Sequence, residues 1–317
     1  MKLLKLVFIG VFFHLASVAT ATTIGYVTNQ GSNSVSVLDL DNFQTIDEIK
    51  VGLKPAGIVV SPDKTRVYVT NPESKSVSVI DTATNQLVQN LNVGDGPLAI
   101  EISPDGLFVY VADWYRHIIS VIDTAETKIV NTIKVGHSPA GIVADPLGKV
   151  IYVSNRDDNT VMIVDLKSGT PQTTIPVGKA PFGMALSVQR KQLYVANVQD
   201  GSVSIIDLQK KKVIVTVKVG LFPYAISYLL KADQLFVTNQ RDNTVSVIDL
   251  KNYNTVKTID VGEYPEGIDK HPSEAYVYVA NWFDGTISVI DTATLEVSKS
   301  IKAGEGTRAY GNFIISK

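Results

Sequence analysis

The chain has 317 residues, of which 45% are hydrophobic and 19% are charged, a composition typical of a globular protein with a large buried core. Its formal net charge of −2 provides no strong field for a polyanion, which disfavours a nucleic-acid binder. Because the chain has no cysteine, disulfides, thiolate metal sites, iron–sulfur clusters and covalently attached c-type heme are excluded.

The N-terminus has the pattern of a secretory signal peptide. Lys2 and Lys5 supply positive charge, residues 6–18 form a mostly apolar run, and the small residues 19–21 form a cleavage pattern. The apolar run is too short to span a bilayer, which takes about 20 residues. We therefore expect cleavage after Ala21 and a periplasmic or secreted protein without a transmembrane segment. The alternative is an uncleaved N-terminal anchor.

A tetrapeptide of the Tyr-Val-Thr-Asn type recurs every 42 residues. Its seven copies begin at residues 26, 68, 110, 152, 194, 236 and 278. One unit holds four short runs rich in Val and Ile, at 55–62, 66–71, 76–81 and 86–93, separated by Gly, Pro, Asn and Asp turn signals. Four strands in about 40 to 45 residues is the spacing of one propeller blade, and the helical period of about 3.6 residues is missing.

The seven units fill the chain after the expected cleavage site. This predicts a signal peptide over 1–21 and a single domain over 22–317, an all-β, seven-bladed β-propeller with four antiparallel strands per blade. Residues 24–29 occupy a second-strand position, whereas the first-strand position recurs for a seventh time at 307–314. One blade is therefore expected to be composite, pairing a C-terminal innermost strand with three N-terminal strands. Such closure hides the sheet edges without a disulfide.

These repeats resemble the YVTN family of seven-bladed β-propellers. The tetrapeptide is intact at 26–29 and 68–71, Val-Ile-Asp-Thr recurs in three units, first at 79–82, and a Val-Gly-x-x-Pro linker recurs in six, first at 51–55. The resemblance covers residues 22–317. It implies the propeller fold rather than one particular function, because such scaffolds host several roles.

Two polar slots recur and are expected to be structural. An aspartate ends the third strand of every unit, where its carboxylate accepts hydrogen bonds from backbone N–H groups two or three residues on, as in an Asx-turn. These aspartates stand at 39, 81, 123, 165, 207, 249 and 291. An asparagine ends the second strand of six units and is expected to have the same turn role, at 29, 71, 155, 197, 239 and 281.

Function is expected where the repeats differ, in the loops that join the fourth strand to the next blade and the second strand to the third. We call the face that carries them the top face. Its loops are rich in aromatic residues, and clustered exposed aromatics are typical of a binding surface. The alternative is that these residues only cap the blades. The predicted ligand-binding residues are Trp114, Tyr115, Arg116, His117, His137, Phe182, Phe222, Tyr224, Tyr264, Glu266, Trp282, Phe283 and Arg308.

Two pairs in this set leave alternatives open. Glu266 and Arg308 occupy adjacent blades at the channel mouth, and they either pair with each other or orient a polar ligand. His137 is expected to approach His117, and two imidazoles can begin a metal site. The sequence offers only Asp113 as a third ligand, so neither a metal nor another cofactor is predicted.

The sequence favours a non-enzymatic, secreted or periplasmic scaffold that presents its top face to a protein partner or a small ligand. It has no Gly-x-Ser-x-Gly elbow, catalytic-triad pattern or phosphate loop, so no catalytic residue is predicted. One alternative is a propeller accessory subunit of a redox complex, since the chain also resembles the propeller subunits of quinoprotein amine dehydrogenases, whose cofactor belongs to a partner chain. The other is a metal-dependent, lactonase-like hydrolase using Glu101, Asp269 and Glu266.

Overall fold

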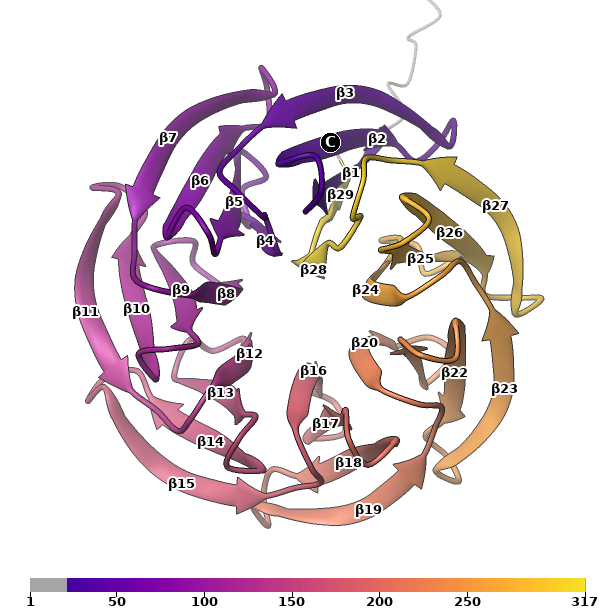
Figure 1. The fold of residues 1–317 in the computed structure, drawn as a ribbon. Coiled ribbons are helices and arrows are strands. Elements are labelled where there is room, and N and C mark those ends of the chain that lie inside the picture. Colours follow the sequence, from indigo (N-terminus) through magenta and orange to yellow (C-terminus); the bar gives the residue numbers. More distant parts are fainter. Residues whose placement is uncertain (1–21, 317) are drawn as a thin grey trace, which may run out of the picture.

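The structure is a computed structural model that describes residues 22–316, and every regular element in this range is a β-strand. The strands form seven blades of four antiparallel strands, and one blade gains β28 (Tyr310–Asn312) as a fifth, parallel strand. Figure 1 shows the blades arranged in a ring. The predicted all-β, seven-bladed propeller is therefore confirmed. The predicted signal peptide lies outside the described residues. Residues 22–316 offer no helix that is long and apolar enough for a membrane span.

Each blade contributes one strand to each of four concentric layers. The innermost strands of six blades are β4 (Gly57–Val60), β8 (Pro97–Ile102), β12 (Pro139–Ala144), β16 (Pro181–Ser187), β20 (Pro223–Leu229) and β24 (Pro265–Lys270). The second strands are β1 (Thr23–Asn29), β5 (Arg66–Asn71), β9 (Phe108–Asp113), β13 (Val150–Asn155), β17 (Gln192–Asn197), β21 (Gln234–Asn239) and β25 (Tyr276–Asn281). The third strands are β2 (Ser34–Asp39), β6 (Ser76–Asp81), β10 (Ile118–Asp123), β14 (Thr160–Asp165), β18 (Ser202–Asp207), β22 (Thr244–Asp249) and β26 (Thr286–Asp291). The outermost strands are β3 (Gln44–Lys50), β7 (Gln86–Asn92), β11 (Lys128–Lys134), β15 (Thr170–Pro176), β19 (Lys212–Lys218), β23 (Asn254–Asp260) and β27 (Glu296–Lys302).

The burial of each layer explains its composition. The second and third strands are almost wholly buried because both faces of a blade pack against neighbouring blades. Their large side chains are mainly β-branched or aromatic, and the third strands β6 and β22 alternate Ser or Thr with Val before ending in Ile-Asp. The outermost strands are mostly exposed and carry Lys, Thr and Asn. The core thus lies between the blades, and the innermost strands are left to line the central channel.

The ring closes through a composite blade, as the repeat frame predicts. The strand β29 (Ile314–Ser316) pairs antiparallel with β1, and β1 continues to β2 and β3. The single strand expected over 307–314 is divided, because β28 (Tyr310–Asn312) instead pairs in parallel with β4 of the next blade. At the break, Oδ2 of Asp269 accepts hydrogen bonds from the backbone N–H groups of Phe313 at 2.9 Å and Ile314 at 3.1 Å. A side-chain carboxylate thus replaces the missing strand partner.

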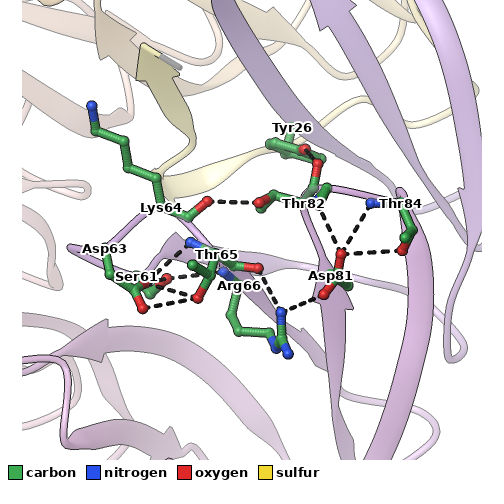
Figure 2. Close-up of polar contacts among 10 residues, drawn as sticks. Tyr26, Ser61, Asp63, Lys64, Thr65, Arg66, Asp81, Thr82 and Thr84 are labelled. Atoms are coloured by element: carbon green, nitrogen blue, oxygen red, sulfur yellow. Dashed lines mark hydrogen bonds and ion pairs between the residues drawn. The ribbon is translucent and has the colours of Figure 1, made fainter.

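The recurrent aspartate shapes a turn in all seven units, as predicted. In Asp81, Oδ1 accepts hydrogen bonds from the backbone N–H groups of Ala83 and Thr84, both at 3.0 Å, and the same carboxylate pairs with Arg66 (Figure 2). Equivalent backbone bonds occur at the other six positions. The slot therefore serves the fold.

The turn role predicted for the recurrent asparagine is wrong, because its contacts are longer in range. The Asn29 amide donates to the hydroxyls of Ser34 at 3.2 Å and Ser36 at 2.8 Å, and its Oδ1 accepts the backbone N–H of Gly304 at 3.1 Å. A Cβ on Gly304 would lie 2.5 Å from Asn29 Cγ, so this linker position needs glycine. The asparagine binds a blade to the linker that enters it, and that partner is remote in sequence.

Candidate functional site

Three aromatic side chains close the channel at the top face, and we call them the mouth plug. Phe182 begins β16, Tyr224 begins β20, and Tyr310 comes from β28. The Phe182 ring centroid lies 4.3 Å from that of Tyr224 and 5.2 Å from that of Tyr310. All three residues are buried, with 5 to 7% of their surface exposed. The expectation that Phe182 and Tyr224 belong to an exposed face is therefore wrong, because side chains at the start of converging innermost strands meet in the channel.

An ion pair completes the mouth. Arg308 Nε lies 2.8 Å from Glu266 Oε2, so of the two alternatives the pairing is the one that the structure shows. Glu266 also accepts a hydrogen bond from Gln240 Nε2 at 2.7 Å, and the Arg308 guanidinium donates to the Tyr224 hydroxyl. Burial raises the pKa of the Glu266 carboxyl, and the charge of Arg308 opposes that shift. Gln240 and Tyr224 thus hold the ion pair in place through hydrogen bonds, and the pair connects the blade of β24 to the C-terminal segment.

A small pocket lies above the plug and joins five of the predicted residues. Its volume is about 250 Å³, and Pro72, Gly96 and Leu98 complete its wall. The predicted residues that line it are Trp114, Tyr115, Phe182, Tyr224 and Arg308. We call it the top pocket. The Tyr115 side chain stands at its edge with 69% of the residue surface exposed, and Arg156 lies over the Trp114 ring at 5.7 Å. The top pocket is apolar on most sides and has one partly exposed guanidinium, that of Arg308, in its wall.

A second aromatic group lies on the blade of β24–β27, apart from the top pocket. Ring centroids of Trp282 and Phe283 are 4.6 Å apart, and Tyr264 lies 5.1 Å from Phe283. Trp282 Nε1 donates to Gln30 Oε1 at 3.1 Å, which anchors the indole to the adjacent blade. Phe283 is 63% exposed, whereas Trp282 and Tyr264 are half-buried. These residues both cap their blade and expose one large ring.

The loops of the top face around the mouth plug form a border that we call the rim. Two further predicted residues of the rim, Phe222 and Arg116, stand apart from both aromatic groups. Phe222 is half-buried beneath Arg241, whose guanidinium carbon lies 3.8 Å from the ring centroid. Arg116 is exposed in the loop after β9. Neither residue lines the top pocket. The predicted aromatic face is therefore a pocket with separate aromatic positions around it rather than one continuous surface.

His117 and His137 lie together, as predicted, with ring centroids 4.8 Å apart. The His137 Nδ1 is 2.7 Å from Asp158 Oδ1, and the His117 Nδ1 accepts the backbone N–H of Ser138 at 3.1 Å. Asp113 does not join them, because its carboxylate accepts backbone N–H groups of its own and the preceding loop. Within the part of the chain that the structure describes, no group of three or more His, Asp or Glu side chains is placed to hold a metal ion.

The three carboxylates of the hydrolase alternative do not share a site. Glu101 and Asp269 line a second cavity, which lies on the other side of the mouth plug and which we call the lower cavity. Glu266 lines neither cavity and is paired with Arg308. This geometry offers no single position at which the three carboxylates could act on one substrate.

Sequence reasoning missed Tyr310 and Gln240 at the mouth. Tyr310 stands in a repeat slot where the other units carry Ile or Met, so a comparison of the repeats would have singled it out. Gln240 follows the recurrent asparagine, and it does not stand out there because other units also carry polar residues in that slot. No local pattern indicates that its amide reaches a carboxylate 26 residues away.

The model of the cytochrome D1 heme domain family matches residues 9–145 and 223–310. No curated protein matches the chain. Among solved structures, hydrazine synthase of Kuenenia stuttgartiensis is 24% identical with a TM-score of 0.76, over 84% of this chain and 92% of that one. A functionally unknown protein of Desulfotomaculum acetoxidans DSM 771 is 16% identical with a TM-score of 0.78, over 91% and 99%. The dihydro-heme d1 dehydrogenase NirN in complex with DHE is 16% identical with a TM-score of 0.70, over 93% and 75%. At these identities the likeness is one of fold.

Proposed function

This chain belongs to the cytochrome D1 heme domain family, and from that premise we propose that it is a non-enzymatic accessory propeller that binds a heme-containing or other redox protein at its top face. The observation that carries this proposal is the closed mouth. The chain fills the centre of its top face with its own aromatic rings and a compensated ion pair, so the face is suited to contact rather than to chemistry.

The residues at the mouth do not fit a heme group. The top pocket, at about 250 Å³, lies below the range of about 300 to 1,000 Å³ that is usual for small-molecule and cofactor sites. Its wall has no His or Met to serve as an axial ligand, and the hydroxyl of Tyr224 is occupied by Arg308. The two nearby imidazoles, those of His117 and His137, do not line the top pocket. A redox cofactor would therefore belong to the bound protein.

The rim has the features of a docking surface. Tyr115 and Phe283 expose most of their surface on different blades, and large rings of this kind act as anchors in protein interfaces. Arg156 and Arg241 lie over aromatic rings, which fixes their guanidinium groups in place, and Arg156 is also paired with Asp157. The top pocket lies beside Tyr115 and has the size for a single apolar or aromatic side chain of a partner.

The location of the protein and its narrower family are part of the same proposal. The predicted signal peptide supports a periplasmic or secreted protein, and the intact tetrapeptides at 26–29 and 68–71 support membership of the YVTN family. A scaffold role without a redox partner is the second candidate. The same exposed aromatic rings favour it, and the experiment below separates the two.

The test is affinity capture from envelope extract with the protein spanning residues 22–317, read by mass spectrometry and by heme absorbance. The comparison uses Tyr115→Ala with Phe283→Ala, and Leu147→Ala serves as the control because Leu147 is 73% exposed in a loop at the other end of the blades. We expect a heme-, quinone- or copper-containing protein, and its purified form should bind the double variant at least tenfold more weakly than the control.

Two results would contradict the proposal. If the purified chain itself bound heme at one equivalent, with a Soret band that persists after gel filtration, the chain would be a heme carrier. If the captured proteins were redox-inactive and bound through the same two rings, the scaffold role would replace the accessory role. Equal binding by the double variant would exclude the top face as the contact surface.

A further inference from the structure

The lower cavity is a second site-sized space, separate from the proposed docking face. Its volume is about 430 Å³, within the range of small-ligand sites. The innermost strands β8, β12, β16, β20 and β24 form its wall, and Tyr310 of the mouth plug belongs to the same wall. Its opposite end lies among Pro104, Pro146 and Val188, which follow the innermost strands at the face away from the top.

One level of the lower cavity is uniformly apolar. Five wall residues occupy the same repeat slot in five consecutive blades, spaced 42 residues apart, and therefore lie at one height in the channel. They are Ile100, Ile142, Met184, Ile226 and Ile268. Such a collar excludes water from the side chains that contact it and favours an apolar body at this height.

The next slot along the same strands breaks the repeat. It holds Glu101 and Asp269 in two units, whereas the other five carry small uncharged residues, which are Val59, Val143, Ala185, Ser227 and Gly311. These small uncharged residues indicate that the blade does not require a carboxylate at this height. A carboxylate beside an apolar collar is costly unless a cation or several donors compensate it. The two acids are therefore the feature of this channel that the fold leaves unexplained.

Neither acid has a cationic partner. Among residues 22–316, no ion pair includes Glu101 or Asp269. Burial raises the pKa of the Glu101 carboxyl to about 7, and only backbone N–H groups, including that of Ile102 at 2.9 Å, oppose the shift. Burial likewise raises the pKa of Asp269 to about 6, and backbone N–H groups together with the charge of the adjacent Lys270, which lies outside ion-pair distance, oppose that shift.

The one cation in the wall is already engaged. Lys270 Nζ lies 3.5 Å from Glu274 Oε1 and also donates to the backbone carbonyl of Tyr228. Asp269 is partly committed to the backbone N–H groups at the break between β28 and β29. The wall of the lower cavity therefore offers its two acids no unengaged cation beside the apolar collar, and Glu101 is the less committed of the two.

We propose that the lower cavity binds an organic ammonium ion with a compact apolar body, which places its charged group at the level of Glu101 and Asp269 and its apolar part against the collar. This site goes beyond the proposed function, since it uses no residue of the rim. A metal ion fits less well, because hard cations such as Ca²⁺ take six to eight oxygen ligands and no group of three acidic or histidine side chains of the described chain could hold one.

The test is isothermal titration calorimetry of the protein spanning 22–317 with hexylammonium, hexanoate and 1-hexanol as probes. The three share one apolar body and differ in charge. We expect hexylammonium to bind, and hexanoate and hexanol to bind at least tenfold more weakly. Glu101→Gln keeps the shape of the side chain and should weaken hexylammonium binding at least tenfold. Glu126→Gln is the matched control, since Glu126 is exposed in an outer turn, and should bind as the wild type does.

A second variant keeps the charges and removes the space. Ala185→Leu adds three carbon atoms to the lower cavity wall and should abolish binding with both acids intact. The proposal is overturned if hexylammonium gives no saturable heat up to millimolar concentration. It is also overturned if hexanol binds equally well, or if Glu101→Gln, shown by its circular dichroism to be folded, binds as tightly as Glu126→Gln.

Discussion

The two ends of the channel differ in the partners that they give to a buried acidic side chain, although the same repeat forms both ends. At the top, Glu266 has Arg308 and Gln240 as partners, and aromatic rings fill the remaining space. Below the plug, Glu101 has only backbone donors and faces a cavity. The repeat thus determines the wall of the channel. Single residues that differ from the repeat decide whether an acidic side chain in that wall has a cationic partner.

Removing residues 305–317 should have the largest effect, because it removes the ion pair and the aromatic ring at the top together with the closure of the ring of blades. This segment supplies Arg308 and Tyr310, and its strands β28 and β29 close the ring. We expect loss of the cooperative folded state, because a folded domain has only about 5 to 15 kcal/mol of stability to lose. Urea unfolding followed by circular dichroism measures this. Removal of Lys317 alone is the control, and a cooperative transition of the shorter chain at the wild-type midpoint would contradict the expectation.

Arg308→Met should make the top resemble the bottom by leaving Glu266 without its cation. Removing one partner of a buried ion pair costs about 3 to 5 kcal/mol, since the other charge stays desolvated. The measurement is the free energy of unfolding from urea titrations at pH 7. Adding Glu266→Gln should restore at least half of the loss. If Arg308→Met cost less than about 1 kcal/mol, the pair would be solvated rather than buried.

Glu101→Gln should remove the less committed acid of the lower cavity and change how stability depends on pH. The pKa of about 7 in the folded protein exceeds the ordinary 4.5, so the folded state holds a proton that the unfolded chain releases between these values. That stabilisation is complete below about pH 4.5 and is lost as the pH rises through 7. Between pH 5 and 8, the wild type should lose about 2 to 3 kcal/mol relative to the variant. Parallel stability curves for the two proteins would contradict this.

Substitutions at the rim should have the smallest effect on stability. Tyr115 and Phe283 are largely exposed, so changing each to Ala should alter the free energy of unfolding by no more than about 0.5 kcal/mol. Trp282→Ala should cost about 1 to 3 kcal/mol, because the indole is half-buried and donates a hydrogen bond to Gln30. Thermal and urea unfolding of the three variants measure this order. A reversal would place Tyr115 and Phe283 in the core.

Much of the architecture is local information repeated seven times. The 42-residue period predicted the blades, and the aspartate that ends each third strand predicted its turn, because an Asx-turn depends only on residues two or three positions away. The composite blade followed from the repeat frame alone. The role of the recurrent asparagine was predicted wrongly because its contacts are not local. For Asn29, the glycine that it binds is Gly304, near the other end of the chain.

At the candidate site, sequence decided which residues are unusual, and only the tertiary structure decided which of them meet. The repeat frame placed Glu266 and Arg308 on adjacent blades and left their pairing open, and the structure shows that they pair. Phe182 and Tyr224 were correctly placed at the mouth but proved buried, because Tyr310 reaches the channel from the C-terminal strand. Whether a side chain at the start of an innermost strand is covered depends on the width of the closed ring and on residues from other blades. Neither quantity is encoded within a single 42-residue unit.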